Sequence, residues 1–264
     1  MFTITNDQKL LVSHFIIAGA KDGTLTKYLS AIRDTGLMDT WMPELTACIT
    51  CGGGDHHDET VYEHLIRSAQ WAAEHEYKYE LQLAALFHDI GKPQSVATDA
   101  LGRLTFHSHE ITGAAIVFQI GTRLEFGREL TQYLVHMTRH HMFRFPINSG
   151  DKTIKRWLLK VGPDWEDLLL LRVADRRGNK AKDNRPEWTP AMLELQAQSR
   201  RIISQSPVTF ITDLVLSERE IKKLVGDKQM KEAIPSLVNL ICDDASRNNK
   251  EWIKNYLQKV WPLK

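Results

Sequence analysis

Apolar residues recur every three or four positions along nearly the whole chain, and this helical periodicity limits the fold more than any other sequence feature. The period is clear in segments 6–18, 26–33, 60–76, 80–89, 111–118, 129–141, 153–160 and 165–177. No segment of more than a few residues alternates apolar and polar side chains as a half-buried strand does. The sequence therefore predicts an all-α fold.

Local signals predict where two of these helices begin and end. Thr60, followed three residues later by Glu63, is typical of a capping box at a helix N-terminus. Gly91 and then Pro93 predict that the preceding apolar helix stops there, with Gly91 as a left-handed cap.

Length, charge and one polar segment bear on the organisation of the chain. A length of 264 residues fits one large domain or two small ones. Segment 176–190 is rich in charge and asparagine, so we expect a helical bundle over residues 1–178 and a C-terminal helical subdomain over residues 179–264. The net charge of +1 argues against a protein that coats nucleic acid, although it leaves a local basic face open.

The sequence shows no pattern typical of a membrane helix or a signal peptide. No window reaches the length of about 18 apolar residues that a membrane helix needs, and the N-terminus does not resemble a signal peptide. Three cysteines cannot build a disulfide framework. We expect a soluble, cytoplasmic protein that does not bind membranes.

Histidines are concentrated, because ten of the eleven lie between His56 and His141 and so indicate a shared site. Within this stretch, His88 and Asp89 end the apolar run 81–87. An ionised carboxylate at the edge of a core costs several kcal/mol unless it is compensated, and a divalent metal compensates it. The dipeptide alone is more typical of a solvated helix end.

Two further residues favour the metal. His64 interrupts the apolar face of its helix, and Asp175 follows an apolar helical stretch. A lone histidine in a core is usually a hydrogen-bonded core residue. Four such misfits on three helices are better explained by one metal centre.

A second set of histidines follows in the next helices. Its members are His107, His109, His136, His140 and His141. We expect His109, together with at least one of His140 and His141, to bind a second metal, and we assign His107 and His136 structural roles. The four-residue spacing of His136 and His140 suits either two ligands or a solvated stripe.

The order His64, His88-Asp89, Asp175 resembles the signature of HD-domain metal-dependent phosphohydrolases. It is more closely similar to the HD region of bacterial tRNA CCA-adding enzymes, and the resemblance implies an HD-domain helical bundle. The similar segments are 37–45, 61–64, 83–93, 106–114, 139–142 and 171–175, with a weaker similarity over 212–251.

The resemblance also implies an activity. CCA-adding enzymes carry an N-terminal nucleotidyltransferase head, and this chain has no room for one, so we expect it to add no nucleotides. The hydrolytic half of those enzymes implies cleavage of 2′,3′-cyclic phosphates, 2′-nucleotides and other phosphoesters of nucleotides or RNA ends. An RNA-repair kinase or ligase is a candidate partner.

In this interpretation two metal ions share one carboxylate, lower the pKa of a bridging water and neutralise charge on phosphoryl oxygens. Nitrogen-rich ligation favours Mn, Co, Ni or Fe over Mg or Ca. Lys92 is the candidate phosphate clamp, and Arg139 and Arg176 are candidate substrate-binding residues, although basic helix faces are equally often just solvated. Asp89 bridges the metals, His64, His88 and Asp175 hold one, and His109 with His140 or His141 holds the other.

Two alternatives come from other functional classes. Some HD-fold proteins use the same ligand set for dioxygen activation at a di-iron centre, and Lys92 with the CCA-like segments favours hydrolysis over this chemistry. A non-catalytic helical module for nucleotides or a partner protein is the other alternative, and the complete ligand set argues against it.

Overall fold

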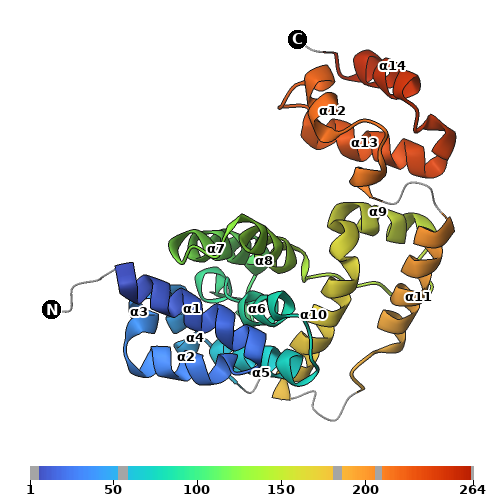
Figure 1. The fold of residues 1–264 in the computed structure, drawn as a ribbon. Helices are drawn as coiled ribbons and strands as arrows, with labels where there is room; N and C mark the ends of the chain where they lie inside the picture. The colour runs from blue at the N-terminus through green and yellow to red at the C-terminus, as the bar shows by residue number, and fades with distance from the viewer. Residues whose placement is uncertain (1–5, 53–58, 181–185, 206–209, 263–264) are drawn as a thin grey trace. The chain divides into compact units, whose positions relative to one another are not determined.

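The computed structural model describes residues 6–52, 59–180, 186–205 and 210–262, and these residues form the helical fold that the periodicity predicts (Figure 1). In chain order the helices are α1 (Asn6–Asp22), α2 (Leu25–Asp34), α3 (Leu37–Trp41), α4 (Pro43–Thr50), α5 (Val61–Glu74), α6 (Tyr79–Phe87), α7 (His109–Arg123), α8 (Arg128–His140), α9 (Asp151–Val161), α10 (Trp165–Gly178), α11 (Pro190–Gln205), α12 (Glu218–Val225), α13 (Met230–Asp243) and α14 (Lys250–Val260). A short hairpin pairs β1 (Ala97–Thr98) with β2 (Leu104–Thr105) in antiparallel register.

Close contacts divide the chain into two compact units. The first unit comprises residues 1–143 and 167–188, and the second comprises residues 144–166 and 189–264. Helix α9 therefore belongs to the second unit, although it lies in sequence between α8 and most of α10. The boundary expected after residue 178, between the helical bundle and a C-terminal subdomain, stays a prediction.

Helix α6 is the central helix of the first unit. It contacts α1, α5 and α8, and all residues from Leu81 to Lys92 are buried. A helix that is surrounded on all sides is apolar all round, which explains why its sequence is a nearly continuous apolar run. Its C-terminal end therefore delivers the next side chains into the interior of the unit.

The predicted capping box at the start of α5 is confirmed. The Thr60 side chain accepts a hydrogen bond from the Glu63 backbone, and the Glu63 carboxylate accepts one from the Thr60 N–H at 2.9 Å. This cap fixes where the first turn starts, and so which positions of α5 face the core. His64 lies on that buried face between Val61 and Leu65.

The second unit has a core of its own. Leu159 of α9 lies in one apolar cluster with residues of α12, α13 and α14, among them Ile221, Leu237 and Ile253. Burial of this cluster is the main stabilising term that the unit can supply. Its amphipathic helices follow from the same three- and four-residue spacing.

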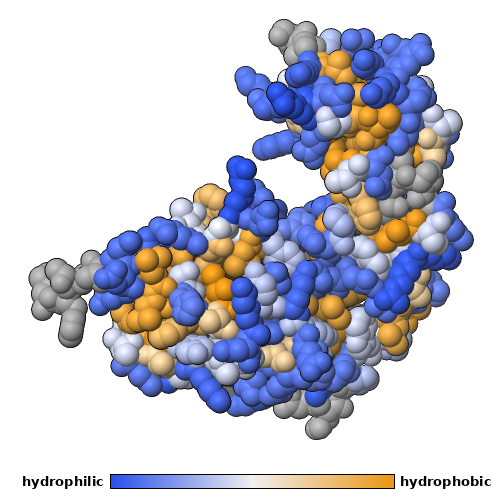
Figure 2. All heavy atoms as spheres, in the orientation of Figure 1, coloured by the Kyte–Doolittle hydropathy of each residue, from blue (hydrophilic) through white to orange (hydrophobic). Residues whose placement is uncertain are grey.

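The surface visible in Figure 2 is mostly hydrophilic, with apolar side chains in smaller clusters. Leu101 and Phe118, with 76% and 59% of their surface exposed, are examples of large apolar residues in contact with solvent. Among the described residues, no helix is both long and apolar enough to cross a membrane.

An ion pair joins α4 to α7 in the first unit. Arg123 donates two hydrogen bonds to the Glu44 carboxylate, at 2.6 and 2.9 Å, and one to the Trp41 carbonyl oxygen at 2.9 Å. Burial by itself raises the pKa of Glu44, but the Arg123 guanidinium outweighs it and holds this pKa below its ordinary value. Charge-assisted paired bonds of this kind are among the stronger ones in proteins.

Replacing Glu44 with Gln should lower the free energy of unfolding by about 1 kcal/mol at pH 7, because solvent screens a partly exposed pair. Since folding lowers this pKa, the contribution is complete above the ordinary glutamate pKa and is lost as the pH falls through the lowered value. Urea denaturation should therefore show a difference at pH 7 that shrinks as the pH falls below the ordinary glutamate pKa. Asp34→Asn, at an exposed pair with Arg33, is the control and should change nothing measurable. An equal loss in both variants contradicts this account.

Candidate metal centre

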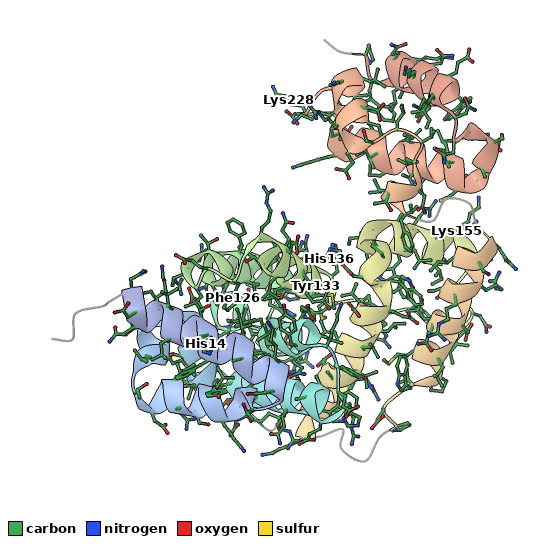
Figure 3. All side chains as sticks on the ribbon, in the orientation of Figure 1. His14, Phe126, Tyr133, His136, Lys155 and Lys228 are labelled. Atoms are coloured by element: carbon green, nitrogen blue, oxygen red, sulfur yellow. The ribbon has the colours of Figure 1, made fainter. Side chains whose placement is uncertain are left out.

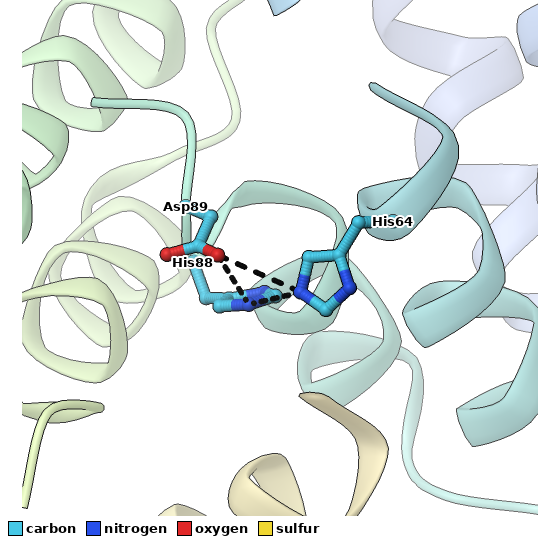
Figure 4. A group of neighbouring side chains, drawn as sticks. All are labelled: His64, His88 and Asp89. Atoms are coloured by element: carbon cyan, nitrogen blue, oxygen red, sulfur yellow. Dashed lines mark hydrogen bonds and ion pairs between the residues drawn. The ribbon is translucent and has the colours of Figure 1, made fainter. Parts of the chain in front are cut away.

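The predicted ligands meet in the first unit, although they come from separate helices. His64 lies on α5, His88 and Asp89 follow α6, His109 begins α7, His141 follows α8, and Asp175 lies on α10. Figure 4 shows the tips of His64, His88 and Asp89 pointing toward one another. Apart from Asp175, whose side chain is 14% exposed, all of these residues are buried.

The Asp89 carboxylate faces a pair of imidazoles on each side. Its Oδ2 lies 3.5 Å from Nε2 of His64 and 3.3 Å from Nε2 of His88. Its Oδ1 lies 3.0 Å from Nε2 of His109 and 3.4 Å from Nε2 of His141. Within each trio the ligand atoms lie within 4.8 Å of one another. Two adjacent candidate metal positions thus share Asp89.

Asp175 adds a second carboxylate to only one of these positions. Its Oδ1 lies 3.3 Å from Nε2 of His64 and 3.8 Å from Nε2 of His88. Its Oδ2 accepts a hydrogen bond from Arg172 Nη1 at 2.9 Å. We call the site of His64, His88, Asp175 and Asp89 Oδ2 the first metal position, and that of His109, His141 and Asp89 Oδ1 the second.

Hydrogen bonds on the outer side of three imidazole rings determine which ring nitrogen carries the hydrogen and which one offers a lone pair to a metal ion. The Nδ1 atoms of His88, His109 and His141 lie 2.9, 2.8 and 2.7 Å from the backbone carbonyl oxygen three residues earlier. A carbonyl oxygen only accepts, so each Nδ1 carries the hydrogen and each Nε2 presents a lone pair to the centre. This is the tautomer in which histidine binds metals.

The spacing of the imidazole nitrogens fits a divalent ion. The Nε2 atoms are 3.1 Å apart in His64 and His88, and 3.2 Å apart in His109 and His141. Metal–imidazole bonds of about 2.0–2.1 Å, at angles from octahedral to tetrahedral, separate two nitrogens by about 2.9–3.4 Å. Two lone pairs that face each other at this distance repel unless a cation lies between them. The residues therefore fit a metal at each position.

The charges of the centre also call for a cation. Burial raises the pKa of Asp89, but the Lys92 ammonium outweighs it and holds this pKa well below its usual range. Burial likewise opposes ionisation of Asp175, and contact with His64 and Arg172 lowers its pKa well below the usual range. Both carboxylates are therefore ionised at neutral pH, which is the form that binds metals. Burial lowers the pKa of His141 and keeps its ring neutral.

Lys92, the predicted phosphate clamp, lies at the first metal position. Its Nζ is 2.6 Å from Asp89 Oδ2, its side chain is 10% exposed, and it also lies over the Phe106 ring. Burial lowers the pKa of Lys92, but Asp89 outweighs this effect and raises it, so the ammonium keeps its charge. Contact with a substrate stays a prediction.

The structure distinguishes the two neighbouring histidines at the end of α8. His141 faces Asp89 and His109, as described above, whereas the half-buried His140 packs against the ring of His136, with 4.8 Å between the ring centroids. Of the two alternatives that the sequence left open, the geometry therefore favours His141 as the ligand. His107 is exposed on the surface.

The two predicted substrate-binding arginines have partners outside the ligand set. Arg139, with 40% of its side chain exposed, lies 3.4 Å from the Glu110 carboxylate. Arg176 donates a hydrogen bond to the Pro186 carbonyl oxygen at 3.2 Å. Their contact with a substrate stays a prediction.

Sequence reasoning missed Glu59, which lies two residues before α5. Its side chain is fully buried, and its Oε1 is 4.0 Å from Nδ1 of His64. The same carboxylate accepts the Lys180 N–H at 3.2 and 3.3 Å. The only sequence signal was an acidic residue directly before the Thr60 cap, inside a polar segment that looked solvated.

Two glycines allow the ligand helices to approach closely. A Cβ on Gly91 would overlap the His109 carbonyl oxygen and the Gly113 backbone. The predicted left-handed cap is wrong, because Gly91 does not have a positive φ, and the residue serves this close approach instead. A Cβ on Gly178 would overlap Ser68 Oγ of α5.

Comparison with known proteins agrees with this geometry. The family model of the HD domain matches residues 61–179, a range that includes every ligand of both metal positions. Residues 61–179 form an HD domain. HD domains belong to a superfamily of metal-dependent hydrolases, so the predicted fold and its resemblance to this family are confirmed.

Several curated relatives match a larger part of the chain. The CC-adding tRNA nucleotidyltransferase of Thermus thermophilus is 30% identical over 61% of this chain and 37% of its own length. The A-adding tRNA nucleotidyltransferase of Deinococcus radiodurans is 29% identical over 72% of this chain and 44% of its own length. The multifunctional CCA protein of Teredinibacter turnerae is 29% identical over 64% and 42%. The matched part thus spans about two fifths of each relative.

His141→Ala should lose the metal ion of the second position, because His141 is one of only three ligands there. It should keep the ion of the first position, because His141 is not a ligand of that position. His140→Ala is the matched control on the neighbouring residue and should keep both ions. The measurement is the Mn content of each protein after equilibrium dialysis, with circular dichroism as the check on folding. Loss of metal in His140→Ala, with none in His141→Ala, reverses the assignment.

Gly91→Ala should destabilise the protein by about 3 kcal/mol, because the new methyl group meets backbone atoms that cannot rotate away. Gly52→Ala is the control, since a Cβ there makes only an ordinary contact with the Leu104 side chain. It should change stability by less than about 0.5 kcal/mol. Urea denaturation measures both, and similar values for the two variants would show that the close approach at Gly91 is unimportant.

Proposed function

We propose that this protein is a metal-dependent phosphohydrolase that opens 2′,3′-cyclic phosphates and cleaves other phosphoesters of nucleotides or RNA ends. The observation that carries the proposal is the Asp89 carboxylate, each oxygen of which faces its own pair of imidazole nitrogens. Two divalent ions, Mn, Co, Ni or Fe, held in this way supply Lewis acidity to phosphoryl oxygens and lower the pKa of water.

The chain's own cations support an anionic substrate. Lys92 keeps its ammonium beside Asp89, where it stabilises negative charge that develops on a phosphoryl group. Arg172 uses one nitrogen on Asp175, and 31% of its side chain is exposed, so further N–H donors are within reach of a phosphate oxygen. Arg139 and Arg176 are candidates for contacts farther along a substrate.

These cations also weigh against the di-iron oxygenase. Dioxygen is neutral and gains little from a buried ammonium or a guanidinium at the centre, whereas a phosphoester gains from both. The non-catalytic alternative leaves unexplained why two complete ligand sets are buried around one carboxylate.

RNA ends are the substrate class that the relatives and the charge distribution favour. The relatives are tRNA nucleotidyltransferases by name, and we extend RNA recognition from them to this chain. The second unit holds 17 Lys and Arg against 12 Asp and Glu, a net charge of +5, while the first unit has a net charge of −4. A basic unit attracts a polyanion, and Lys155 and Lys228 are two of its cations (Figure 3). An RNA-repair kinase or ligase that acts on the opened ends is the proposed partner class, in the cytoplasm.

Hydrolysis of 2′,3′-cyclic AMP, p-nitrophenyl phosphate and bis-p-nitrophenyl phosphate, measured with Mn, Co and Ni, tests the proposal. Turnover should require added metal and stop with a chelator. Asp89→Asn should lower it about a thousandfold or more, because the variant loses the charge that both metal positions share. Asp34→Asn, at a carboxylate with 69% of its side chain exposed, is the control and should keep full activity.

Failure of the wild-type protein to turn over any of the three substrates with any metal contradicts the proposal. Iron retention with a visible absorption band would then favour the oxygenase. The absence of both would favour the non-catalytic module.

A further inference from the structure

Glu59 is a buried carboxylate that the proposed reaction does not use. It lies outside the segment matched by the HD family model and has no exposed side-chain surface. Burial of a carboxylate is costly unless other groups compensate it, so a residue of this kind needs a specific partner. Its carboxylate accepts the backbone N–H of Lys180, at 3.2 and 3.3 Å, and lies 4.0 Å from Nδ1 of His64.

His64 differs from the other imidazoles of the centre in what lies behind its ring. The Nδ1 atoms of His88, His109 and His141 each face a neutral carbonyl oxygen of their own helix or turn. The Nδ1 of His64 faces a carboxylate that comes from outside its helix. At this distance the carboxylate is too far away for a hydrogen bond, but its negative charge favours the tautomer with the hydrogen on Nδ1, which leaves the lone pair of Nε2 for a metal ion.

Through its contact with Lys180, the Glu59 carboxylate also reaches the segment that follows a second ligand-bearing helix. Lys180 lies two residues beyond the end of α10, the helix that carries Asp175. Glu59 therefore ties the start of α5 to the end of α10, and these helices supply His64 and Asp175. Both are ligands of the first metal position only.

The two metal positions also differ in their ligands. The first has two imidazoles and the carboxylates of Asp175 and Asp89, whereas the second has two imidazoles and only the shared Asp89. Lys92 and Arg172 offset the charge of Asp175 and Glu59 at the first position, so its main advantage is the fourth ligand. The first position is therefore the one built for tight binding.

We propose that Glu59 is a positioning residue that strengthens the first metal position, by favouring the metal-binding tautomer of His64 and by tying the start of α5 to the end of α10. This inference rests on the proposed metal-dependent function. It concerns the order and strength of metal binding, and its test does not require turnover.

Titration calorimetry of the metal-free full chain with Mn²⁺ tests the inference. The wild-type protein should bind two ions in a tight and a weak step. Glu59→Gln keeps the shape of the side chain and removes its charge, so it should weaken the tight step by about 10- to 100-fold. The weak step should stay the same. A merely structural loss would weaken both steps together.

Two further variants make the result decisive. Glu74→Gln changes an exposed carboxylate at the far end of the same helix, where Glu74 accepts a hydrogen bond from Gln70, and it should bind as the wild type does. Glu59→Asp keeps the charge but withdraws it from His64, so it should weaken the tight step by a smaller factor, and it is the variant to measure if Glu59→Gln does not fold.

An unchanged tight step in Glu59→Gln, or in Glu59→Asp where that variant is used instead, overturns the role of Glu59 and leaves the proposed function standing. A wild-type protein that binds no Mn²⁺, Co²⁺ or Ni²⁺ overturns the proposed function itself. The visible absorption of bound Co²⁺ gives a second reading, because a change of tautomer or orientation at His64 alters the ligand field of the tight site alone.

Discussion

The rest of the first unit depends on one buried carboxylate, that of Asp89, because each of its two oxygens faces a different pair of imidazoles. Asp89 is buried, ionised and surrounded by four imidazole nitrogens, Lys92 and a second carboxylate nearby. Such a group is stable in an interior only when positive charge reaches both of its oxygens. The fold meets this requirement by bringing ligands from five separate segments to the end of one fully buried helix.

Backbone packing makes that assembly possible. Gly91 lets the start of α7 lie against the turn that carries Asp89, and Gly178 lets the end of α10 lie against α5. A methyl group at either position would overlap the neighbouring segment, so a segment that carries a ligand would have to shift. The coordination geometry is therefore set by close helix contacts as much as by the ligands themselves.

Much of this was predictable from the sequence, and the reason is burial. The spacing of apolar residues predicts the helices. His64 and Asp175 can be identified as candidate ligands because each is a polar residue at a position where the pattern calls for an apolar one. The capping box at Thr60 was also readable, because it depends on residues only three positions apart.

The remainder depends on contacts between distant segments. His140 and His141 are adjacent, and successive side chains on a helix point about 100° apart, so the orientation of α8 in the bundle decides which one faces Asp89. Glu59 lies in a segment whose composition is typical of a solvated turn, and no local pattern predicts its contact with Lys180, more than a hundred residues later. Local rules predict a cap at Gly91, whereas the structure shows that Gly91 allows a close approach of α7.

The most direct test of a shared carboxylate is the electron paramagnetic resonance spectrum of the protein loaded with two Mn²⁺ ions per chain. If Asp89 bridges the two positions, the ions lie close together and their spins are coupled. The spectrum should then be the broad, temperature-dependent one of an exchange-coupled pair. A spectrum made only of the six-line signal of isolated Mn²⁺ at full occupancy would contradict a bridging Asp89 and with it the account of the centre given above.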